Sequence, residues 1–181
     1  MPSDSQTPKL KIGISSCLLG QSVRYDGGHS HSQTCTDFIE QHFVYVPFCP
    51  EVSAGFGTPR APMNLVGDSA SPKLKYVDIS ADKHNSALND KLISGFLAQL
   101  DLVNELDGYI TKSRSPSCGF GSTPLYLKTG ERSSETDSGL FISALKERYP
   151  KLPIVEETEL EDEVSCARFL DQVYFYHQLQ N

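Results

Sequence analysis

The sequence predicts a single α/β domain with a mainly parallel, Rossmann-like sheet flanked by helices. Short β-branched and aromatic runs alternate with segments whose apolar residues recur at helical spacing, as in strands joined by crossover helices. The chain has 181 residues, enough for one full core and too few for two comfortable ones. We expect residues 1–9 to form a flexible tail and residues 10–181 to form the domain.

The N-terminal part contributes two strands of the expected sheet. The first begins near Leu10 and leads into Cys17, and the second is Phe43–Phe48. A helix over 33–42 would cross back over the sheet, so we expect the two strands to be parallel. The stretch 50–59 contains two prolines and two glycines, which predicts a stiff turn without regular structure.

The middle of the chain predicts a small β-hairpin insertion and the longest helix. Two short runs, 63–66 and 76–79, flank a turn-rich segment and indicate the hairpin. The helix should begin at Ser80, a residue type that favours helix starts, and carry an apolar stripe to a stop at Gly108.

The last third again alternates strands and helices. Six acidic residues between 156 and 163 are expected to charge and solvate the start of the final helix. We expect strands at 108–111, 125–127 and 152–155, and helices from Asp137 or Ser138 to Pro150 and over 164–177.

Composition indicates a cytoplasmic protein with a small-molecule partner. The formal charge is -7, and the clustered Lys and Arg that a nucleic-acid surface needs are missing from the sequence. No apolar stretch is long enough to span a bilayer, and residues 1–10 lack the apolar core of a signal peptide. The odd count of five cysteines argues against a disulfide framework.

Three of the cysteines, Cys17, Cys49 and Cys118, each follow a predicted strand. The carboxyl ends of parallel strands share one edge, where ligands bind, so these thiols could meet. Converging thiolates suit zinc or an iron–sulfur cluster, although three small buried residues would give the same pattern. Cys35 and Cys166 lack this placement, and we expect them to be structural.

Polar residues near these cysteines could carry chemistry. Glu51 lies two residues past Cys49, where a carboxylate could act as general acid or base, or simply be exposed in a turn. The hydroxyls of Ser115 and Ser117 could donate to a substrate or to sulfur, or make local turn bonds. Arg60 could clamp an anion or a carbonyl, although arginine is most often a surface residue.

Four motifs are specific in combination, within a match that covers nearly the whole chain after the tail. They are IGISSCLLG at 12–20, VRYDG at 23–27, CPEV at 49–52 followed by Gly55 and Pro59-Arg60, and KS through SPSCG at 112–119. On these motifs the chain resembles the 2-thiouracil desulfidase family.

The resemblance implies a cofactor and a reaction. It implies an oxygen-sensitive 4Fe-4S cluster held by Cys17, Cys49 and Cys118, with the fourth iron free to take sulfur from a thiolated base such as 2-thiouracil. Glu51 and Ser115 would be the catalytic pair, and the products would be uracil and sulfide. The chemistry belongs to sulfur metabolism.

A substrate pocket is expected between this cluster, Arg60 and the segment Arg24-Tyr25-Asp26-Gly27. Glycine permits close approach of a ligand, and tyrosine offers an aromatic face to a flat base. Asp26 itself is better suited to a turn bond than to a metal.

Two other functions are compatible with the same residues. One is a zinc-dependent hydrolase of a small molecule, with three cysteine ligands and an activated water. The other is a non-enzymatic α/β module that binds a nucleobase or nucleoside and leaves its thiols unliganded.

Overall fold

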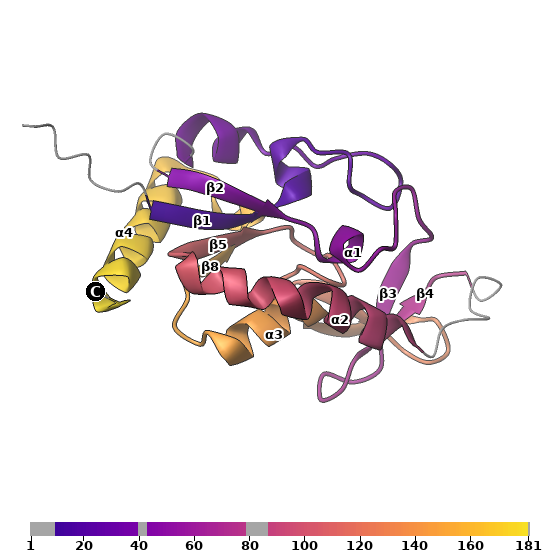
Figure 1. The fold of residues 1–181 in the computed structure, drawn as a ribbon. Coiled ribbons are helices and arrows are strands. Elements are labelled where there is room, and N and C mark those ends of the chain that lie inside the picture. The colour runs from indigo at the N-terminus through magenta and orange to yellow at the C-terminus, as the bar shows by residue number, and fades with distance from the viewer. Residues whose placement is uncertain (1–9, 40–42, 79–86, 181) are drawn as a thin grey trace, which may run out of the picture.

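The structure, a computed structural model, describes residues 10–39, 43–78 and 87–180. The expected flexible tail over residues 1–9 lies outside these ranges. Figure 1 shows the arrangement of the elements.

A four-stranded parallel sheet with the order β2-β1-β5-β8 forms the centre of the molecule (Figure 1). Its two central strands, β1 and β5, are almost entirely buried, which matches their apolar sequences. All three pairings are parallel, so the α/β fold class and the mainly parallel sheet are confirmed. The strands are β1 (Leu10–Ser15), β2 (Phe43–Phe48), β5 (Gly108–Thr111) and β8 (Ile154–Glu156).

Helices cover both faces of this sheet. The helices α2 (Leu88–Leu100) and α3 (Leu140–Arg148) pack in one core, and α4 (Glu163–Gln180) packs in the other. Strand β5 supplies both cores, because successive side chains of a strand point to opposite faces. Tyr109 lies in the α2–α3 core, and Ile110 lies in the α4 core.

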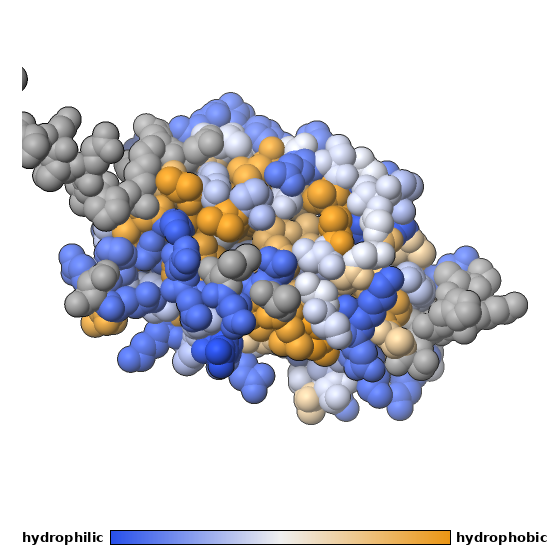
Figure 2. Space-filling model, in the orientation of Figure 1, coloured by the Kyte–Doolittle hydropathy of each residue, from blue (hydrophilic) through white to orange (hydrophobic). Residues whose placement is uncertain are grey.

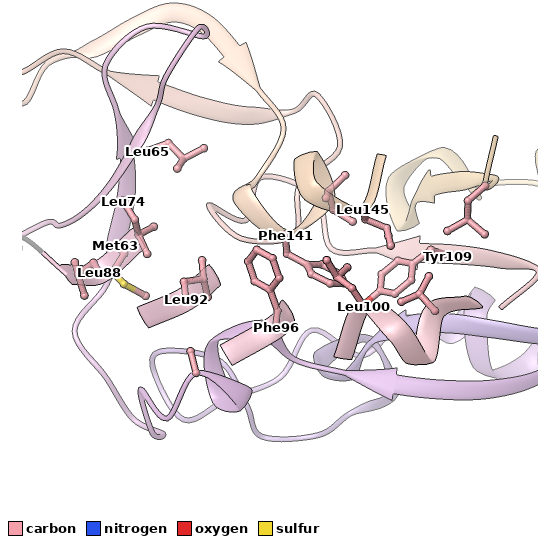
Figure 3. Packing of buried hydrophobic residues seen from close by; sticks show 14 of the residues in the cluster. Met63, Leu65, Leu74, Leu88, Leu92, Phe96, Leu100, Tyr109, Phe141 and Leu145 are labelled. Carbon is pink, nitrogen blue, oxygen red and sulfur yellow. The ribbon is translucent and has the colours of Figure 1, made fainter. Parts of the chain in front are cut away.

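Aromatic rings fill the core between α2, α3 and the sheet (Figure 3). The ring centroid of Phe141 lies 5.4 Å from that of Phe96 and 5.6 Å from that of Tyr109. Offset and edge-on contacts at this spacing are favourable beyond the apolar area that they bury. The apolar stripe predicted for the long helix is confirmed, because Leu88, Leu92, Phe96 and Leu100 are all buried.

The predicted hairpin is half of a second sheet, with the order β4-β3-β6-β7. β3 pairs antiparallel with β4, but β4 begins at Lys73 rather than at the predicted residue 76. Leu74 is buried opposite Leu65, and this pair sets the earlier start. The polar, mostly exposed β7 has no apolar alternation and was not predicted. The strands are β3 (Met63–Val66), β4 (Lys73–Tyr76), β6 (Thr123–Tyr126) and β7 (Arg132–Asp137).

Several predicted boundaries are corrected by the structure. The helix predicted over 33–42 contains a π-helical segment, Cys35–Ile39, and its last three residues lie outside the described ranges. The long helix ends at Leu100 and continues as a 3₁₀ segment, Asp101–Glu105, while its predicted start at Ser80 is also outside those ranges. The last strand begins at Ile154 rather than at residue 152.

The stretch after β2 was predicted to lack regular structure, and this is wrong. Pro50–Ser53 forms a single helical turn, α1. Proline is compatible with the first helical position, because the N–H that it lacks would have no partner there. The short elements that remain are the 3₁₀ segments η1 (Ser16–Leu19) and η5 (Glu157–Glu159).

The surface in Figure 2 carries its apolar residues as separate patches among polar ones. Among the described helices, none combines the length and apolar character that a membrane crossing requires.

Candidate functional site

Three cysteines meet at the edge of the parallel sheet where its strands end. Cys17 follows β1, Cys49 follows β2, and Cys118 lies in the loop after β5. Since these strands are neighbours and parallel, their carboxyl ends open on one crevice. All three cysteines are free thiols and line a single pocket of about 550 Å³. The structure thus brings together the cysteines that the sequence places after strand ends.

Backbone hydrogen bonds fix the segments that carry two of these thiols. Cys17 lies in η1, which ends at Gly20, and the Gly20 N–H donates to the Cys17 carbonyl at 3.3 Å. Gly20 has a φ of 82°, a conformation that favours glycine. The Cys118 N–H donates to Ser115 Oγ at 3.1 Å, and the Cys118 carbonyl accepts a hydrogen bond from the Thr111 hydroxyl.

The three thiols favour their protonated form when no cation is bound. Burial, followed by the charge of Cys49, raises the pKa of Cys17 to about 11, while Lys112 acts in the opposite direction. Burial also raises the pKa of Cys49, and it raises that of Cys118 well above its usual range. Three thiolates in this pocket therefore need a positive partner, and metal binding to thiols releases their protons. The donor set fits a soft metal group.

The spacing of the thiols also bears on the kind of group they could hold. Within residues 10–39, 43–78 and 87–180, no three His, Cys, Asp or Glu side chains stand together as the ligands of one metal ion do. The three thiols line one pocket but are not grouped as the ligands of a single ion would be. Single metal ions and iron–sulfur clusters differ in this respect, because the cysteine ligands of a cluster bind different iron atoms.

Glu51 is buried beside the thiols, and both of its carboxylate oxygens are bound. Only 8% of the residue is exposed, so the alternative of an exposed turn glutamate is wrong. Arg60 donates to Oε2 through Nε at 2.6 Å and Nη2 at 2.5 Å. The Ser117 hydroxyl donates to Oε1 at 2.7 Å. These partners offset the cost of burying a carboxylate.

Arg60 lines the pocket and also joins two loops. Its Nη1 donates to the carbonyls of Val23 at 2.9 Å and Gly57 at 3.0 Å, and its backbone N–H donates to the Tyr25 carbonyl at 2.8 Å. Its side chain is only 7% exposed, which differs from the usual surface arginine. Most of its guanidinium donors are therefore committed to Glu51 and to backbone carbonyls.

The expected substrate loop divides into two parts. Arg24 and Tyr25 line the pocket, and the Arg24 guanidinium lies 5.6 Å from the Tyr25 ring centroid. Asp26 and Gly27 instead shape the turn. Asp26 Oδ1 accepts a hydrogen bond from the Gly28 N–H at 3.0 Å, and the Gly27 N–H donates to the Arg24 carbonyl at 3.0 Å. Asp26 thus makes the turn bond that the sequence favours.

Ser115 lines the pocket and closes the turn that carries Cys118. Its Oγ accepts hydrogen bonds from the N–H groups of Ser117 at 3.3 Å and Cys118 at 3.1 Å. Because the hydroxyl oxygen is the acceptor in both bonds, its proton can be donated to a molecule in the pocket. Turn bonding and substrate contact are therefore compatible roles for this serine.

One wall of the pocket is a charged network that the sequence analysis missed. Lys112 Nζ is ion-paired with Glu157 and donates to Ser113 Oγ at 2.9 Å. Glu157 also accepts hydrogen bonds from the Ser113 N–H at 2.7 Å and hydroxyl at 2.8 Å. Lys112 and Ser113 belong to the last sequence motif, which was the only signal for this network.

The acidic run 156–163 was interpreted as serving the final helix, and its first residues do not. Glu156 Oε1 accepts a hydrogen bond from the Phe120 N–H at 2.6 Å, so it holds the loop after β5. Only the end of the run acts at the helix start, where Asp162 Oδ1 accepts from the Ser165 N–H at 2.7 Å.

The other two cysteines lie outside the residues that line this pocket. Cys35, in the π-helical segment Cys35–Ile39, and Cys166, in α4, are buried in the core on the α4 face of the sheet. This placement agrees with the structural role expected for them.

Comparison with known proteins shows which family the chain belongs to. The sequence model of the 2-thiouracil desulfurase family matches residues 12–157. The uncharacterized protein YbbK of Bacillus subtilis (strain 168) is 29% identical over 153 residues, which cover 83% of this chain and 98% of YbbK. The solved structure of TudS, a [4Fe-4S]-dependent thiouracil desulfidase, is 29% identical with a TM-score of 0.60, over 90% of this chain and 99% of that one. The chain belongs to the 2-thiouracil desulfurase family.

Proposed function

We propose that the protein is an iron–sulfur-dependent desulfidase that removes sulfur from a thiolated nucleobase, converting 2-thiouracil to uracil and sulfide. One observation carries the proposal. Three thiols from separate segments, together with a buried carboxylate two residues after one of them, line one pocket in a chain of the 2-thiouracil desulfurase family. The pocket volume of about 550 Å³ lies within the usual range for small-molecule sites.

Cys17, Cys49 and Cys118 would hold a 4Fe-4S cluster. With only three protein ligands, the bound cluster would supply an iron with an open position, which acts as a Lewis acid toward the soft sulfur of the substrate. In the overall reaction, the oxygen of water forms a bond to the ring carbon and the carbon–sulfur bond breaks. Sulfur leaves as sulfide, so no external oxidant or reductant is needed.

Glu51 would take the proton from the attacking water and return it to the departing group. A carboxylate oxygen has room for two acceptor contacts, so Oε1 can bind a water in addition to the Ser117 hydroxyl. The Arg60 contacts to Oε2 would keep the carboxylate oriented while the proton moves.

Ser115 would orient the base or the departing sulfur through its hydroxyl proton. Its oxygen is anchored by two backbone N–H groups, so the direction of the remaining O–H is restricted. Restricted donors stabilise developing charge without reorganising during the reaction.

Substrate binding is assigned to Arg24, Tyr25, Asp26, Gly27 and Arg60. Tyr25 would stack on the flat base, and Arg24 would interact with a ring carbonyl. Asp26 and Gly27 would contribute by shaping the turn, and Arg60 by fixing this loop to the Glu51 segment.

The setting of the reaction is part of the same proposal. Five free cysteines suit the reducing cytoplasm, where a reaction of sulfur metabolism would take place. Residues 10–181 would act as one catalytic domain, preceded by a tail over 1–9. A zinc hydrolase and a non-enzymatic nucleobase-binding module are the rival functions, and the family match favours the desulfidase over both.

Anaerobic reconstitution with iron and sulfide, followed by metal and sulfide analysis and an assay with 2-thiouracil, tests this function. We expect about four irons and four sulfides per chain, together with release of uracil and sulfide. Zinc alone, or thermal stabilisation by the base without metal or turnover, would favour one of the rivals.

A further inference from the structure

The hydroxyl of Tyr109 is a buried polar group without a partner in the described part of the chain. The residue is only 1% exposed. Buried polar groups in folded proteins are almost always hydrogen-bonded, and an unpaired one destabilises the fold. An unpaired hydroxyl at this depth therefore points to a partner that the polypeptide itself does not supply.

The core around Tyr109 needs an aromatic ring but not a hydroxyl. Tyr109 on β5 pairs with Gly13 on β1. A Cβ added to Gly13 would come within 2.4 Å of the Tyr109 ring, so the glycine makes the space that the ring occupies. On its other side the ring packs on Phe141 (Figure 3). A phenylalanine would make the same apolar contacts.

The Tyr109 ring lies in the packing layer next to the cysteine site. It packs on Phe141, whose ring centroid lies 5.1 Å from that of Phe48, the pocket residue that precedes Cys49. In agreement with this placement, the charges of the three pocket thiols are, after burial, the largest causes that raise the pKa of Tyr109. The Ser15 hydroxyl, two residues beyond Gly13 and on the same face of β1, is a hydrogen-bonding group close enough to the phenol to lower this pKa. Its geometry nevertheless does not make a hydrogen bond with the phenol.

We propose that Tyr109 donates a hydrogen bond from its phenol to a sulfur atom of the cluster that Cys17, Cys49 and Cys118 would hold. The inference rests on the proposed cofactor. Sulfide and thiolate sulfur carry negative charge and accept hydrogen bonds, and the neutral phenol has a proton to give. Tyr109 would thereby be a positioning residue that stabilises the cluster and sets its reduction potential.

Comparing the apoprotein with the loaded protein tests this assignment, because the effect of Tyr109→Phe should reverse. In the apoprotein the substitution removes an unpaired hydroxyl, so thermal stability should be unchanged or higher. In the loaded protein a chelator should strip the cluster about 3- to 10-fold faster, as the loss of one hydrogen bond predicts. The reduced-to-oxidised ratio at a fixed potential should fall about tenfold, which is about 59 mV for a one-electron couple.

Tyr149→Phe is the matched control, because the Tyr149 hydroxyl donates to the Leu100 carbonyl at 3.0 Å, and Tyr149 is not among the pocket residues. This variant should lower apoprotein stability and leave the chelation rate and the potential unchanged.

Three outcomes would contradict the inference. If Tyr109→Phe behaves like the control, its hydroxyl has a protein partner, and the inference is overturned. If the loaded wild type and the loaded Tyr109→Phe variant have the same chelation rate and the same potential, the inference is overturned but the proposed function is not. A wild type that takes up no cluster would overturn the proposed function and the inference with it.

Discussion

Cys17 and Cys35 are alike in burial and acidity but differ in their neighbours. Both belong to the core on the α4 face of the sheet, and burial is the main cause that raises the pKa of each to about 11. The next influence on Cys17 is the charge of another thiol, Cys49. The next influence on Cys35 is a hydrogen bond with Ser32, which lowers its pKa. Burial and acidity therefore do not distinguish the two cysteines. The pocket does, because Cys17 lines it with the cations of Lys112 and Arg24 nearby, whereas Cys35 does not line it and has the Cys166 thiol nearby in the core.

The position of each cysteine in the sheet explains this difference. Cys17, Cys49 and Cys118 follow adjacent parallel strands, so the fold delivers them to one edge. Cys35 and Cys166 lie in helical segments that pack on a face of the sheet.

Replacement of single cysteines by serine should divide the five positions into two groups. Cys17→Ser, Cys49→Ser and Cys118→Ser should each lose most of the visible absorption of the cluster, because serine is a poor substitute for a soft thiolate ligand. Cys35→Ser and Cys166→Ser should retain it. Iron and sulfide content measured after anaerobic reconstitution checks the division. Normal cluster content in Cys118→Ser would break the contrast.

Substitutions in the proposed catalytic pair should lower the rate of desulfidation without loss of the cluster. Glu51→Gln keeps the side-chain shape but removes the base, and Ser115→Ala removes one hydroxyl. A positioned general base contributes about 10²- to 10⁴-fold in rate, and an electrostatic donor about 10²- to 10³-fold. Both variants should keep wild-type iron content and lose at least about two orders of magnitude in desulfidation. Near-normal turnover by Glu51→Gln would exclude its proposed role, and loss of iron would make it a structural partner or ligand.

Ser117→Ala should reduce turnover only indirectly, because Ser117 acts on the carboxylate of Glu51. The variant removes the hydroxyl that donates to Glu51 Oε1. A hydrogen bond to a charged group corresponds to roughly 10- to 100-fold, so we expect a fall in kcat of about that size with KM and cluster content unchanged. Ser122→Ala is the control, because Ser122 also donates to a glutamate, but that glutamate, Glu156, does not line the pocket as Glu51 does. Equal losses of kcat in both variants would indicate a general effect on the loop.

The smallest effect is expected at the mouth of the pocket. Tyr25 is 43% exposed, so Tyr25→Ala should leave the fold and the cluster intact. Loss of one aromatic contact should raise the apparent KM for 2-thiouracil about 3- to 10-fold. Tyr174→Ala, at a similarly exposed tyrosine on α4, should leave KM unchanged. Steady-state kinetics that show no difference between the two variants would remove Tyr25 from the site.

The sequence was sufficient to predict that three thiols converge, because strand ends are marked by apolar runs followed by Gly, Pro or Ser. It was not sufficient to predict how Glu51 is held. Arg60 and Ser117 reach this carboxylate from different loops, and no local pattern records a contact of that kind. For a similar reason the second sheet was underestimated, since β7 is an exposed polar strand defined by its pairing with β6 rather than by its own residues.

The strand ends that carry the three thiols are far apart in the chain and become neighbours only when β2, β1 and β5 have paired. The proposed ligand set is therefore a product of complete folding, unlike a zinc finger, in which metal binding and folding are one event. Both hydrophobic cores are built from side chains alone, so the apoprotein should be a folded acceptor with an open pocket. Whatever delivers iron and sulfide would then recognise a finished surface, and maturation of the site would be the last step in the biogenesis of the protein.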